Sequence, residues 1–340
     1  IRELPEGCWS FEDQLDDDSH SPGPVPLKVT LSIRHRPKPH MVFDFTGSSP
    51  QRIGAVNVVY EALFATVAYV LKATIDPELW SNAAFERVVQ IVVPEGSVLN
   101  PRPPAAVGGR GTTCQRLADL LLGAMAQVAP ERVCACGHGT TSINIHGHDP
   151  SRRRPFICID GIGGGMGGRE GHDGMDAVQI HTNNIPNLPV EILESEYPLR
   201  VERFELVPDS GGAGRFRGGL GTRKDFRMLA DIGYIAHADR HEFAPWPLLG
   251  GKEGRMGMHL RNPGRPDEKR LPSKGGPFDF KAGEVLRCQS AGAGGYGDPA
   301  QRDPQSLAID LADGKITEKA ARESYPRDLV EEALRRAEIL

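Results

Sequence analysis

Five residues with metal-binding side chains lie close together in the sequence: Cys134, Cys136, His138, His146 and His148. Thiolates and imidazoles are ligands that zinc and copper prefer. The Cys-x-Cys-x-His spacing differs from that of common zinc sites, and the alternating segment INIHGH predicts a strand with the last two histidines on one face. We therefore expect buried thiols, surface histidines and no metal in this chain, with a zinc or copper site as the alternative.

The glycine-rich segment 161–168 contains the pattern G-x-G-x-x-G after an expected strand at 156–159. A dinucleotide site needs a helix to begin at the third glycine, so that its amides meet the pyrophosphate. Here the chain continues as REGHDG, where no helix is expected, and no G-x-x-x-x-G-K-[ST] segment occurs. We interpret the glycine segments 161–168, 211–221 and 292–297 as tight corners between strands or a subunit seam. Lining of an active site is the alternative.

Two charged residues stand out by their surroundings. Asp44 lies in the apolar segment FDFTG, where a buried carboxylate needs a partner, although it can also cap a turn. Arg110 is the charged residue of the loop VGGRG and can clamp an anion or pair with a carboxylate. No G-x-S-x-G segment indicates a nucleophilic serine.

The composition excludes several classes of protein. Glycine and proline account for 40 and 28 of the 340 residues, which excludes a helical bundle, a coiled coil and a helical repeat array. The 40 basic residues nearly balance the 45 acidic ones, so we expect no binding to nucleic acid or to a membrane surface. No window reaches the roughly 18 consecutive apolar residues of a membrane span. The six cysteines are too few for a disulfide scaffold, and we expect reduced thiols in a cytoplasmic protein.

The elements that would position these residues follow from the hydrophobic periodicity. It predicts an α+β fold with mainly antiparallel or mixed β-structure, glycine-rich corners, two buried helices and a C-terminal helical appendage. Thr112 or Thr113 is expected to cap the second helix. The expected domains are a β-rich segment with the two helices at 1–140, a glycine-loop β domain at 141–300 and a helical tail at 301–340. The expected strands are 26–33, 40–45, 88–93, 156–159, 200–207, 231–238 and 282–289, and the expected helices are 58–74, 114–128, 304–313, 316–324 and 327–339.

Two features concern the first part of the chain. The acidic triplet 16–18 is interpreted as a solvated loop, with a cation site as the alternative. The sequence begins Ile-Arg-Glu-Leu-Pro, without an initiator methionine or a secretory signal. We therefore expect it to be the remainder of a longer protein or a processed piece.

Several segments, taken in order, resemble the hydantoinase B/5-oxoprolinase family. The resemblance runs from about Leu4 to about Tyr325, and the last two segments are its most specific part. The segments are MVFDFTGSSPQRIGAVN, VVPEGSVLNPRPPAAVGGR, GIGGGMGGREGHDG, NIPNLPVEILESEYPLRVERFELVPDSGGAGRFRGGLG and SAGAGGYGDP.

The resemblance implies an enzyme that depends on a partner. A hydantoinase A-like ATPase subunit would bind ATP and Mg and phosphorylate the substrate oxygen, and this chain would process the activated intermediate. The implied function is that of a subunit of an ATP-dependent hydrolase of cyclic amides such as hydantoin, 5-oxoproline or a related lactam. The alternatives are a subunit of an acetone- or acetophenone-type ketone carboxylase and a non-catalytic structural subunit.

One departure from the family concerns metal. Members are usually longer, and their metal-associated His and Asp motif lies in an N-terminal region that this chain lacks. The resemblance therefore implies a further partner, a chain or segment that carries this region and a divalent metal. No metal ligand is transferred to this chain.

Position in the matching segments and residue chemistry together give the candidate site for a small-molecule substrate. The candidate catalytic residues are Asp44, Arg110 and Asp173. The candidate substrate-binding residues are Gly163, Gly164, Gly165, Asp209, Gly211 and Gly212.

Overall fold

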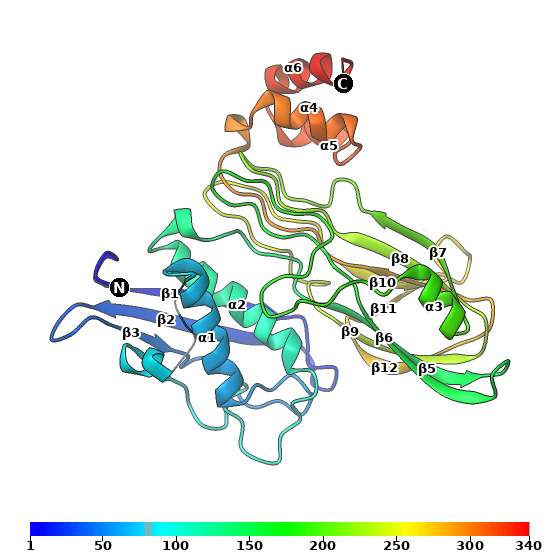
Figure 1. The fold of residues 1–340 in the computed structure, drawn as a ribbon, viewed down its shortest axis with the longest axis horizontal. Coiled ribbons are helices and arrows are strands. Elements are labelled where there is room, and N and C mark those ends of the chain that lie inside the picture. Colours follow the sequence, from blue (N-terminus) through cyan, green and yellow to red (C-terminus); the bar gives the residue numbers. More distant parts are fainter. Residues whose placement is uncertain (79, 81–82, 340) are drawn as a thin grey trace. The chain divides into compact units, whose positions relative to one another are not determined.

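In the computed structural model, which describes residues 1–78, 80 and 83–339, the chain forms two compact units, Ile1–Cys134 and Ala135–Leu340. Within the described residues there are three β-sheets, and helices both precede and follow the larger β region (Figure 1). One strand pair is parallel and the others are antiparallel. The predicted α+β class with mainly antiparallel or mixed β-structure is confirmed.

The first unit is a four-stranded sheet with two helices on one face. Its strands are β1 (Gly7–Leu15), β2 (Val25–Arg34), β3 (His40–Asp44) and β4 (Val89–Val92), in that order, and β4 runs parallel to β3. Alternate residues of β2 are buried, as expected for a strand with one covered face. Helices α1 (Tyr60–Thr74) and α2 (Arg110–Ala126) cover that face, and the 3-10 helices η1 (Ala83–Arg87) and η2 (Pro130–Arg132) lie in the connections (Figure 1).

Helix α2 differs from its expected start. It begins at Arg110, four residues before the expected position, so neither Thr112 nor Thr113 is its N-cap. Gly109 occupies that position without a side-chain cap, and the hydroxyl of Thr113 donates instead to the carbonyl of Val56 at 2.6 Å. A threonine hydroxyl inside the first turn can bond elsewhere, which sequence alone does not reveal.

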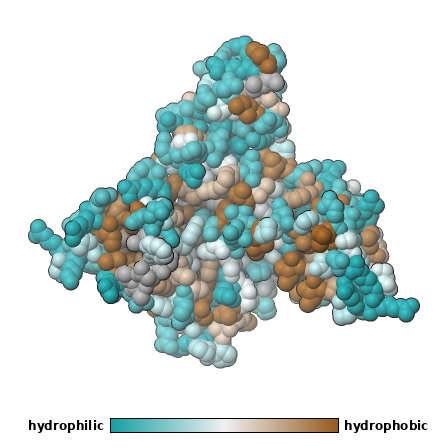
Figure 2. Space-filling model, viewed as in Figure 1, coloured by the Kyte–Doolittle hydropathy of each residue, from teal (hydrophilic) through white to brown (hydrophobic). Residues whose placement is uncertain are grey.

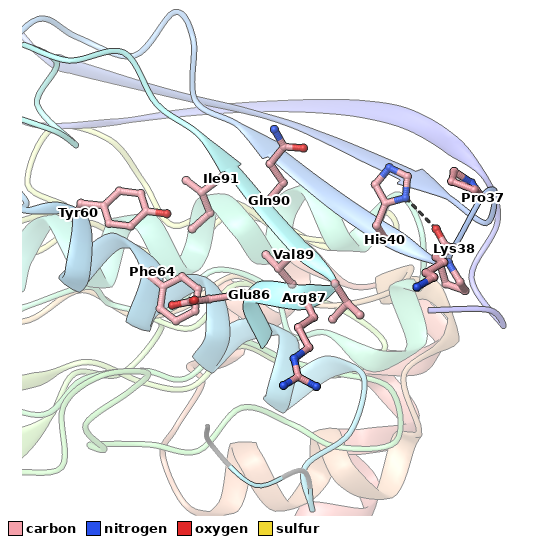
Figure 3. Close-up of a pocket in the computed structure, with 12 residues that line it drawn as sticks. Pro37, Lys38, His40, Tyr60, Phe64, Glu86, Arg87, Val89, Gln90 and Ile91 are labelled. Atoms are coloured by element: carbon pink, nitrogen blue, oxygen red, sulfur yellow. Dashed lines mark hydrogen bonds between the residues drawn. The ribbon is translucent and has the colours of Figure 1, made fainter. Parts of the chain in front are cut away.

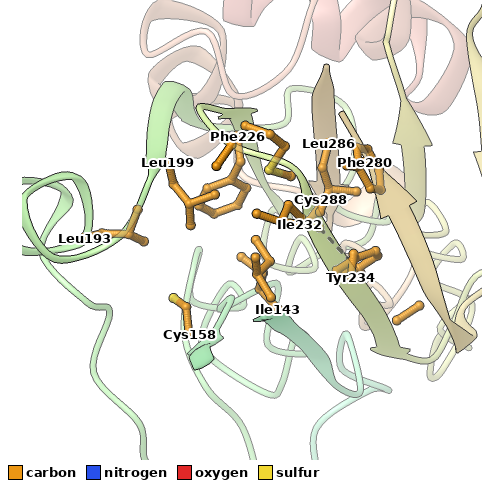
Figure 4. Close-up of a cluster of buried hydrophobic side chains, with 14 of the residues drawn as sticks. Ile143, Cys158, Leu193, Leu199, Phe226, Ile232, Tyr234, Phe280, Leu286 and Cys288 are labelled. Carbon is orange, nitrogen blue, oxygen red and sulfur yellow. Dashed lines mark hydrogen bonds between the residues drawn. The ribbon is translucent and has the colours of Figure 1, made fainter. Parts of the chain in front are cut away.

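The second unit contains two antiparallel sheets that face each other. One sheet has the order β11-β10-β13-β8-β7 and the other β12-β9-β5-β6. Their inward side chains form a shared hydrophobic core that includes Ile143, Phe226, Tyr234 and Leu286 (Figure 4). The strands are β5 (Thr141–Asp149), β6 (Arg154–Gly161), β7 (Leu199–Leu206), β8 (Thr222–Met228), β9 (Ile232–Ala238), β10 (Met258–Arg261), β11 (Lys269–Leu271), β12 (Lys274–Phe280) and β13 (Val285–Gln289), and helix α3 (Val190–Glu196) precedes β7.

The outer face of the second sheet is partly apolar. Ile157 and Ile159 on β6 are 69% and 68% exposed, and Ile235 on β9 is 41% exposed. Hydrophobic side chains are visible on the surface over this sheet (Figure 2).

Glycine-rich extended segments connect the sandwich to the C-terminal helices α4 (Pro304–Ala312), α5 (Glu318–Ser324) and α6 (Arg327–Ala337) (Figure 1). These helices bury Leu307, Tyr325 and Val330 in a small core that also includes Ala213 of the second glycine segment. Asp303 caps α4 and Thr317 caps α5. The predicted C-terminal helical appendage is therefore present.

Candidate functional site

The three glycine segments of the second unit lie side by side and bond backbone to backbone. The amide of Gly168 donates to the carbonyl of Gly294 at 3.0 Å, and that of Gly219 donates to Met166 at 2.8 Å. A Cβ on Gly165 would lie 2.1 Å from the carbonyl oxygen of Gly219, which is far below any real contact. Glycine is required here because the neighbouring backbones approach too closely for a side chain.

The candidate substrate-binding glycines belong to this bundle. Gly163, Gly164 and Gly165 are buried, and the atoms that face them are those of the chain itself. A phosphate cradle needs free amides, yet the amides of Gly164, Gly165 and Gly212 donate to backbone carbonyls of Val178, Ala291 and Ala293. The Cα of Gly211 likewise faces the carbonyl of Gly218, at 2.0 Å from an added Cβ. The structure thus assigns these glycines packing contacts, and their part in substrate binding stays a prediction.

Asp173 forms an ion pair with Arg302, an arginine that lies 129 residues later in the sequence. Its two carboxylate oxygens accept from the guanidinium of Arg302 at 2.9 Å each, and one also accepts from the backbone amide of Arg217 at 2.6 Å. Arg302 is fully buried, whereas the side chain of Asp173 is 32% exposed. Burial pushes the pKa of Asp173 upward, but the hydrogen bond and charge of Arg302 outweigh it and hold this pKa below its usual value.

The ion pair extends into a buried network. Asp310 of α4 accepts from Arg302 at 2.5 Å and from Nε of Arg217 at 3.2 Å. Arg217 also donates to Asp176 at 3.1 Å and to the carbonyl of Gly218 at 2.7 Å. These bonds join the loop that follows the first glycine segment, the second glycine segment and α4. Such a network stabilises one arrangement of these segments, because each charge is paired inside the protein.

Asp209 connects the second glycine segment to α5. Its backbone has a φ of 61°, and its carboxylate accepts from the amide and the hydroxyl of Thr317 at 2.7 and 3.0 Å. The amide of Asp209 in turn donates to the carbonyl of Lys315 at 3.0 Å. The predicted loop-shaping aspartate therefore contacts the start of a helix, and a contact with substrate stays a prediction.

Asp44 and Arg110 both lie in the first unit. The half-buried Asp44 ends β3 and accepts from the amide of Thr46 at 2.8 Å, which is the turn-capping arrangement. The exposed Arg110 begins α2 and donates to the carbonyl of Val107 at 3.4 Å. Among the described residues no ion pair joins the two, so any joint action on a substrate stays a prediction.

The second part of the cysteine- and histidine-rich segment forms the expected strand, and Cys134, Cys136 and His138 precede it. In β5, His146 is half-buried and His148 is exposed on the same face, and the ring of His146 lies over Gly233. Cys136 is buried as expected, but the expectation of a surface histidine is wrong for His138, which is buried with its Nδ1 3.3 Å from the carbonyl oxygen of Gly165. Within the described ranges, no three His, Cys, Asp or Glu side chains are placed to hold a metal ion.

The acidic triplet 16–18 is largely buried, so the expectation of a solvated loop is wrong. Asp16 and Asp18 are only 5% and 1% exposed. Asp18 accepts from the amides of His20 and Ser21 at 3.0 and 2.5 Å, which offsets the cost of burying its charge. Burial pushes the pKa of Asp18 upward, but these bonds outweigh it and hold the pKa below its usual value.

A groove of about 730 Å³ lies in the first unit beside β4 (Figure 3). Tyr60 and Phe64 of α1 and Ile91 of β4 give it apolar walls. Lys38 and Arg87 lie at the end where β3 and β4 begin, and Glu86 also lines the groove, so its walls carry charges of both signs. The groove can take an apolar group together with a polar one.

Sequence reasoning missed the groove and the buried network. Arg302 and Asp310 look like ordinary surface charges in a segment that carries several charges. One feature of the sequence could have indicated the network. Arg217 lies inside PDSGGAGRFRGGLG, and a long side chain among closely packed glycines must extend away from the segment. Nothing in the sequence indicated that Arg302 pairs with Asp173, which is 129 residues away.

Comparison with known proteins gives consistent matches. The sequence model of the hydantoinase B/oxoprolinase family matches residues 1–299. A protein of Pseudomonas sp. (strain NS671), provisionally named as a D-/L-hydantoinase subunit, is 32% identical over 338 residues, covering 96% of this chain and 56% of the relative. The 5-oxoprolinase 1 of Arabidopsis thaliana is 32% identical over 84% of this chain and 21% of its own length.

Two solved structures have the same fold. The ATP-dependent caprolactamase of Pseudomonas jessenii superimposes with a TM-score of 0.84 and 26% identity over 94% of this chain and 57% of that one. A nucleotide-free acetone carboxylase superimposes with a TM-score of 0.84 at 17% identity, covering 99% and 53%, which shows likeness of fold alone. This chain spans about half the length of the first relatives that it matches. Among the described residues no helix has the length and apolarity needed to cross a membrane.

Proposed function

The chain belongs to the hydantoinase B/oxoprolinase family, and from this membership we propose that it is a subunit of an ATP-dependent hydrolase of cyclic amides. The observation that carries the proposal is the match over residues 1–299, together with relatives whose names specify hydantoinase, 5-oxoprolinase and caprolactamase. The substrate class is a hydantoin, 5-oxoproline or a related lactam. All three are rings closed by an amide bond.

In this proposal, a hydantoinase A-like partner subunit binds ATP and Mg. An amide carbonyl is a poor electrophile, and transfer of the γ-phosphoryl group to its oxygen makes the carbon open to attack by water. Water then adds to this carbon, and the C–N bond of the ring breaks as the nitrogen takes up a proton, which gives an acyl phosphate. A second water hydrolyses the acyl phosphate to the carboxylate and free phosphate. The bundle of glycine segments supports placing ATP elsewhere, because the amides that would cradle a phosphate already donate to the chain.

Of the candidate catalytic residues, Arg110 is the best placed to meet an anionic intermediate. Its side chain is exposed, and among the described residues its guanidinium forms a single, long hydrogen bond, to the carbonyl of Val107 at 3.4 Å. It begins α2, where the aligned peptide dipoles of the helix add partial positive charge. Asp173, in contrast, is bound by Arg302 on both oxygens. We propose that Arg110 orients the phosphorylated intermediate, and a catalytic part for Asp173 stays a prediction.

The test is reconstitution with the hydantoinase A-like ATPase and the chain or segment that carries the family's metal region. Hydantoin, 5-oxoproline and caprolactam are supplied with ATP, and ring-opened product and ADP are measured together. The proposal predicts product only when this chain is present, with one ADP per ring opened. Bicarbonate-dependent consumption of acetone or acetophenone instead would identify a carboxylase, and full ring opening without this chain would identify a structural subunit.

A further inference from the structure

The outer edge of β4 in the first unit is an unpaired strand edge. Among the described residues β4 ends the order β1-β2-β3-β4 and pairs with β3 alone. The amides of Met41 and Phe45 donate to the carbonyls of Val88 and Val92, so residues 88, 90 and 92 turn their backbone groups toward β3. Backbone groups alternate along a strand. The N–H and C=O groups of Val89 and Ile91 therefore point away from the sheet.

Such an edge is unusual in its composition. Residues 88–93 read VVQIVV, a run with high β-propensity and no charge. Val88 and Val92 are 37% and 36% exposed. Natural proteins normally protect an edge with charge, proline or a covering segment, because an open apolar edge accepts another strand.

The helix layer extends past this edge. Tyr60 and Phe64 of α1 line the groove with Val89 and Ile91, so the groove lies under the helix where the next strand of the sheet would run (Figure 3). Tyr60 is 42% exposed in the absence of such a strand. An added strand would bury these apolar side chains and pair the outward backbone groups in one step.

The sequence of the edge fits a second copy of itself. In an antiparallel pair centred on Gln90, Val89 of each copy lies opposite Ile91 of the other, and the outward groups of both form four hydrogen bonds. Val88 then lies opposite Val92, so apolar residues meet apolar residues on both faces. VVQIVV reads nearly the same in both directions, which makes this register self-complementary.

The charges at the two ends of β4 are also complementary in this register. Arg87 precedes the strand and forms no ion pair in the part of the chain that the structure describes. Glu95 follows it and, within the described ranges, pairs only with the exposed Arg102, at 3.4 Å. Arg87 is the last residue of η1 and Glu95 lies in the turn after β4, so both lie just outside the strand. In the antiparallel register, the end of β4 next to Arg87 in one copy adjoins the end next to Glu95 in the other, which is a contact between opposite charges. The twofold axis makes this contact twice.

We propose that β4 is a homodimerisation edge, at which two copies of this chain join their four-stranded sheets into one continuous sheet of eight. The occupant of the groove is thus the β4 edge of a second copy. The inference rests on the geometry of the first unit and is independent of the proposed reaction. Because one strand pair buries less than the roughly 1,200 Å² of a standard interface, the dimer is expected to be weak.

Sedimentation equilibrium of the full chain tests this proposal. Between about 1 and about 300 µM, the mass should rise from 36.9 kDa toward twice that value. Over the same range, hydrogen exchange at Val89 and Ile91 should slow, while exchange at the already paired Gln90 should not change. A chain that stays monomeric, or a dimer whose formation leaves Val89 and Ile91 unprotected, overturns the proposal.

Two sets of variants locate the contact. Ile91→Pro removes an outward N–H that the isolated unit does not use, so the chain should fold while dimerisation weakens about tenfold or more. Ile91→Val keeps the N–H and is the matched control. Arg87→Glu and Glu95→Arg should each weaken the dimer about threefold, and the double variant should restore it, because the two charges exchange places.

The double variant also covers the case in which the proline variant fails to fold, since it changes only exposed side chains. If neither charge reversal changes the dissociation constant of the dimer, the two copies contact each other through another surface, such as the one that carries the isoleucines of β6, and the proposal is overturned. An assembly in which a segment from another chain, and not a second copy, protects Val89 and Ile91 also overturns it.

Discussion

Replacing Gly218 by alanine is the sharpest test of the glycine bundle. The Cβ of the new residue would lie 2.0 Å from the carbonyl oxygen of Ala293 and 2.8 Å from that of Gly294. Ordinary contact begins at 3.4 Å, so the two segments must separate by about 1.4 Å at this point. The atoms that the new Cβ would meet belong to the backbone of Ala293 and Gly294, and a backbone cannot relieve the clash by changing rotamer as a side chain can.

The size of the effect follows from the bonds that this separation would break. The oxygen of Ala293 accepts from the amide of Gly212 at 2.8 Å, and the amide of Gly218 donates to the carbonyl of Gly212 at 2.9 Å. Each buried backbone group left without a partner costs about 1–3 kcal/mol. Overpacking adds about 1–3 kcal/mol. The free energy of unfolding should therefore fall by about 4 kcal/mol or more, a large part of the 5–15 kcal/mol typical of a domain.

Gly171→Ala is the matched control. Gly171 has a φ of 79° but no atom within 4 Å of an added Cβ, so alanine there bears only the left-handed backbone cost of about 1–2 kcal/mol. Urea unfolding followed by circular dichroism gives the free energies, and hydrogen exchange at Gly212 and Ala293 locates the change. Equal losses in the two variants, or a loss below about 1 kcal/mol for Gly218→Ala, would refute the packing argument.

Three further predictions concern charged residues. Arg302→Met should lower the free energy of unfolding by about 3–5 kcal/mol in urea melts, because it leaves Asp173 and the buried Asp310 without their main partner. The pKa values of Asp18 and Asp173 are lowered in the folded chain, so folding is favoured by their ionised forms. Their contribution to the free energy of unfolding should be complete above the unfolded-state pKa of about 3.9 and should be lost as the pH falls below it. Asp18→Asn should therefore make the free energy of unfolding less dependent on pH in this acid range, as measured by melts at several pH values. Arg110→Ala in the reconstituted complex should cut turnover while gel filtration shows normal assembly; full turnover would remove Arg110 from the catalytic residues.

The sequence predicted the elements with a strong period and missed those that depend on distant partners. The buried helix at 58–74 and the strand that contains His146 and His148 follow from spacing alone, and both are present as α1 and β5. The short strands β10 and β11 were missed, since four- and three-residue strands carry too little alternation to stand out. Their pairing with each other and with β13 creates them.

The candidate site shows the same division. Glycine clusters at three places predicted close backbone approach, because no other residue type permits it. Which segment meets which was not predictable, since the pairing of Gly165 with Gly219 depends on the whole fold. The burial of Asp18 was missed for a related reason. A run of three aspartates is normally solvated, and only the turn back onto Ser21 supplies the amides that stabilise the carboxylate.

The segments that carry the family resemblance are also the ones that the fold itself needs. PDSGGAGRFRGGLG and SAGAGGYGDP contain Gly218, Arg217 and Gly294, and each of these residues is occupied by a contact inside the second unit. A motif of this kind therefore identifies a scaffold and says little about the chemistry performed on it. Residues free to act on a substrate must be sought among side chains that the fold leaves available. In this chain Arg110 meets that condition and Asp173, held on both oxygens, does not.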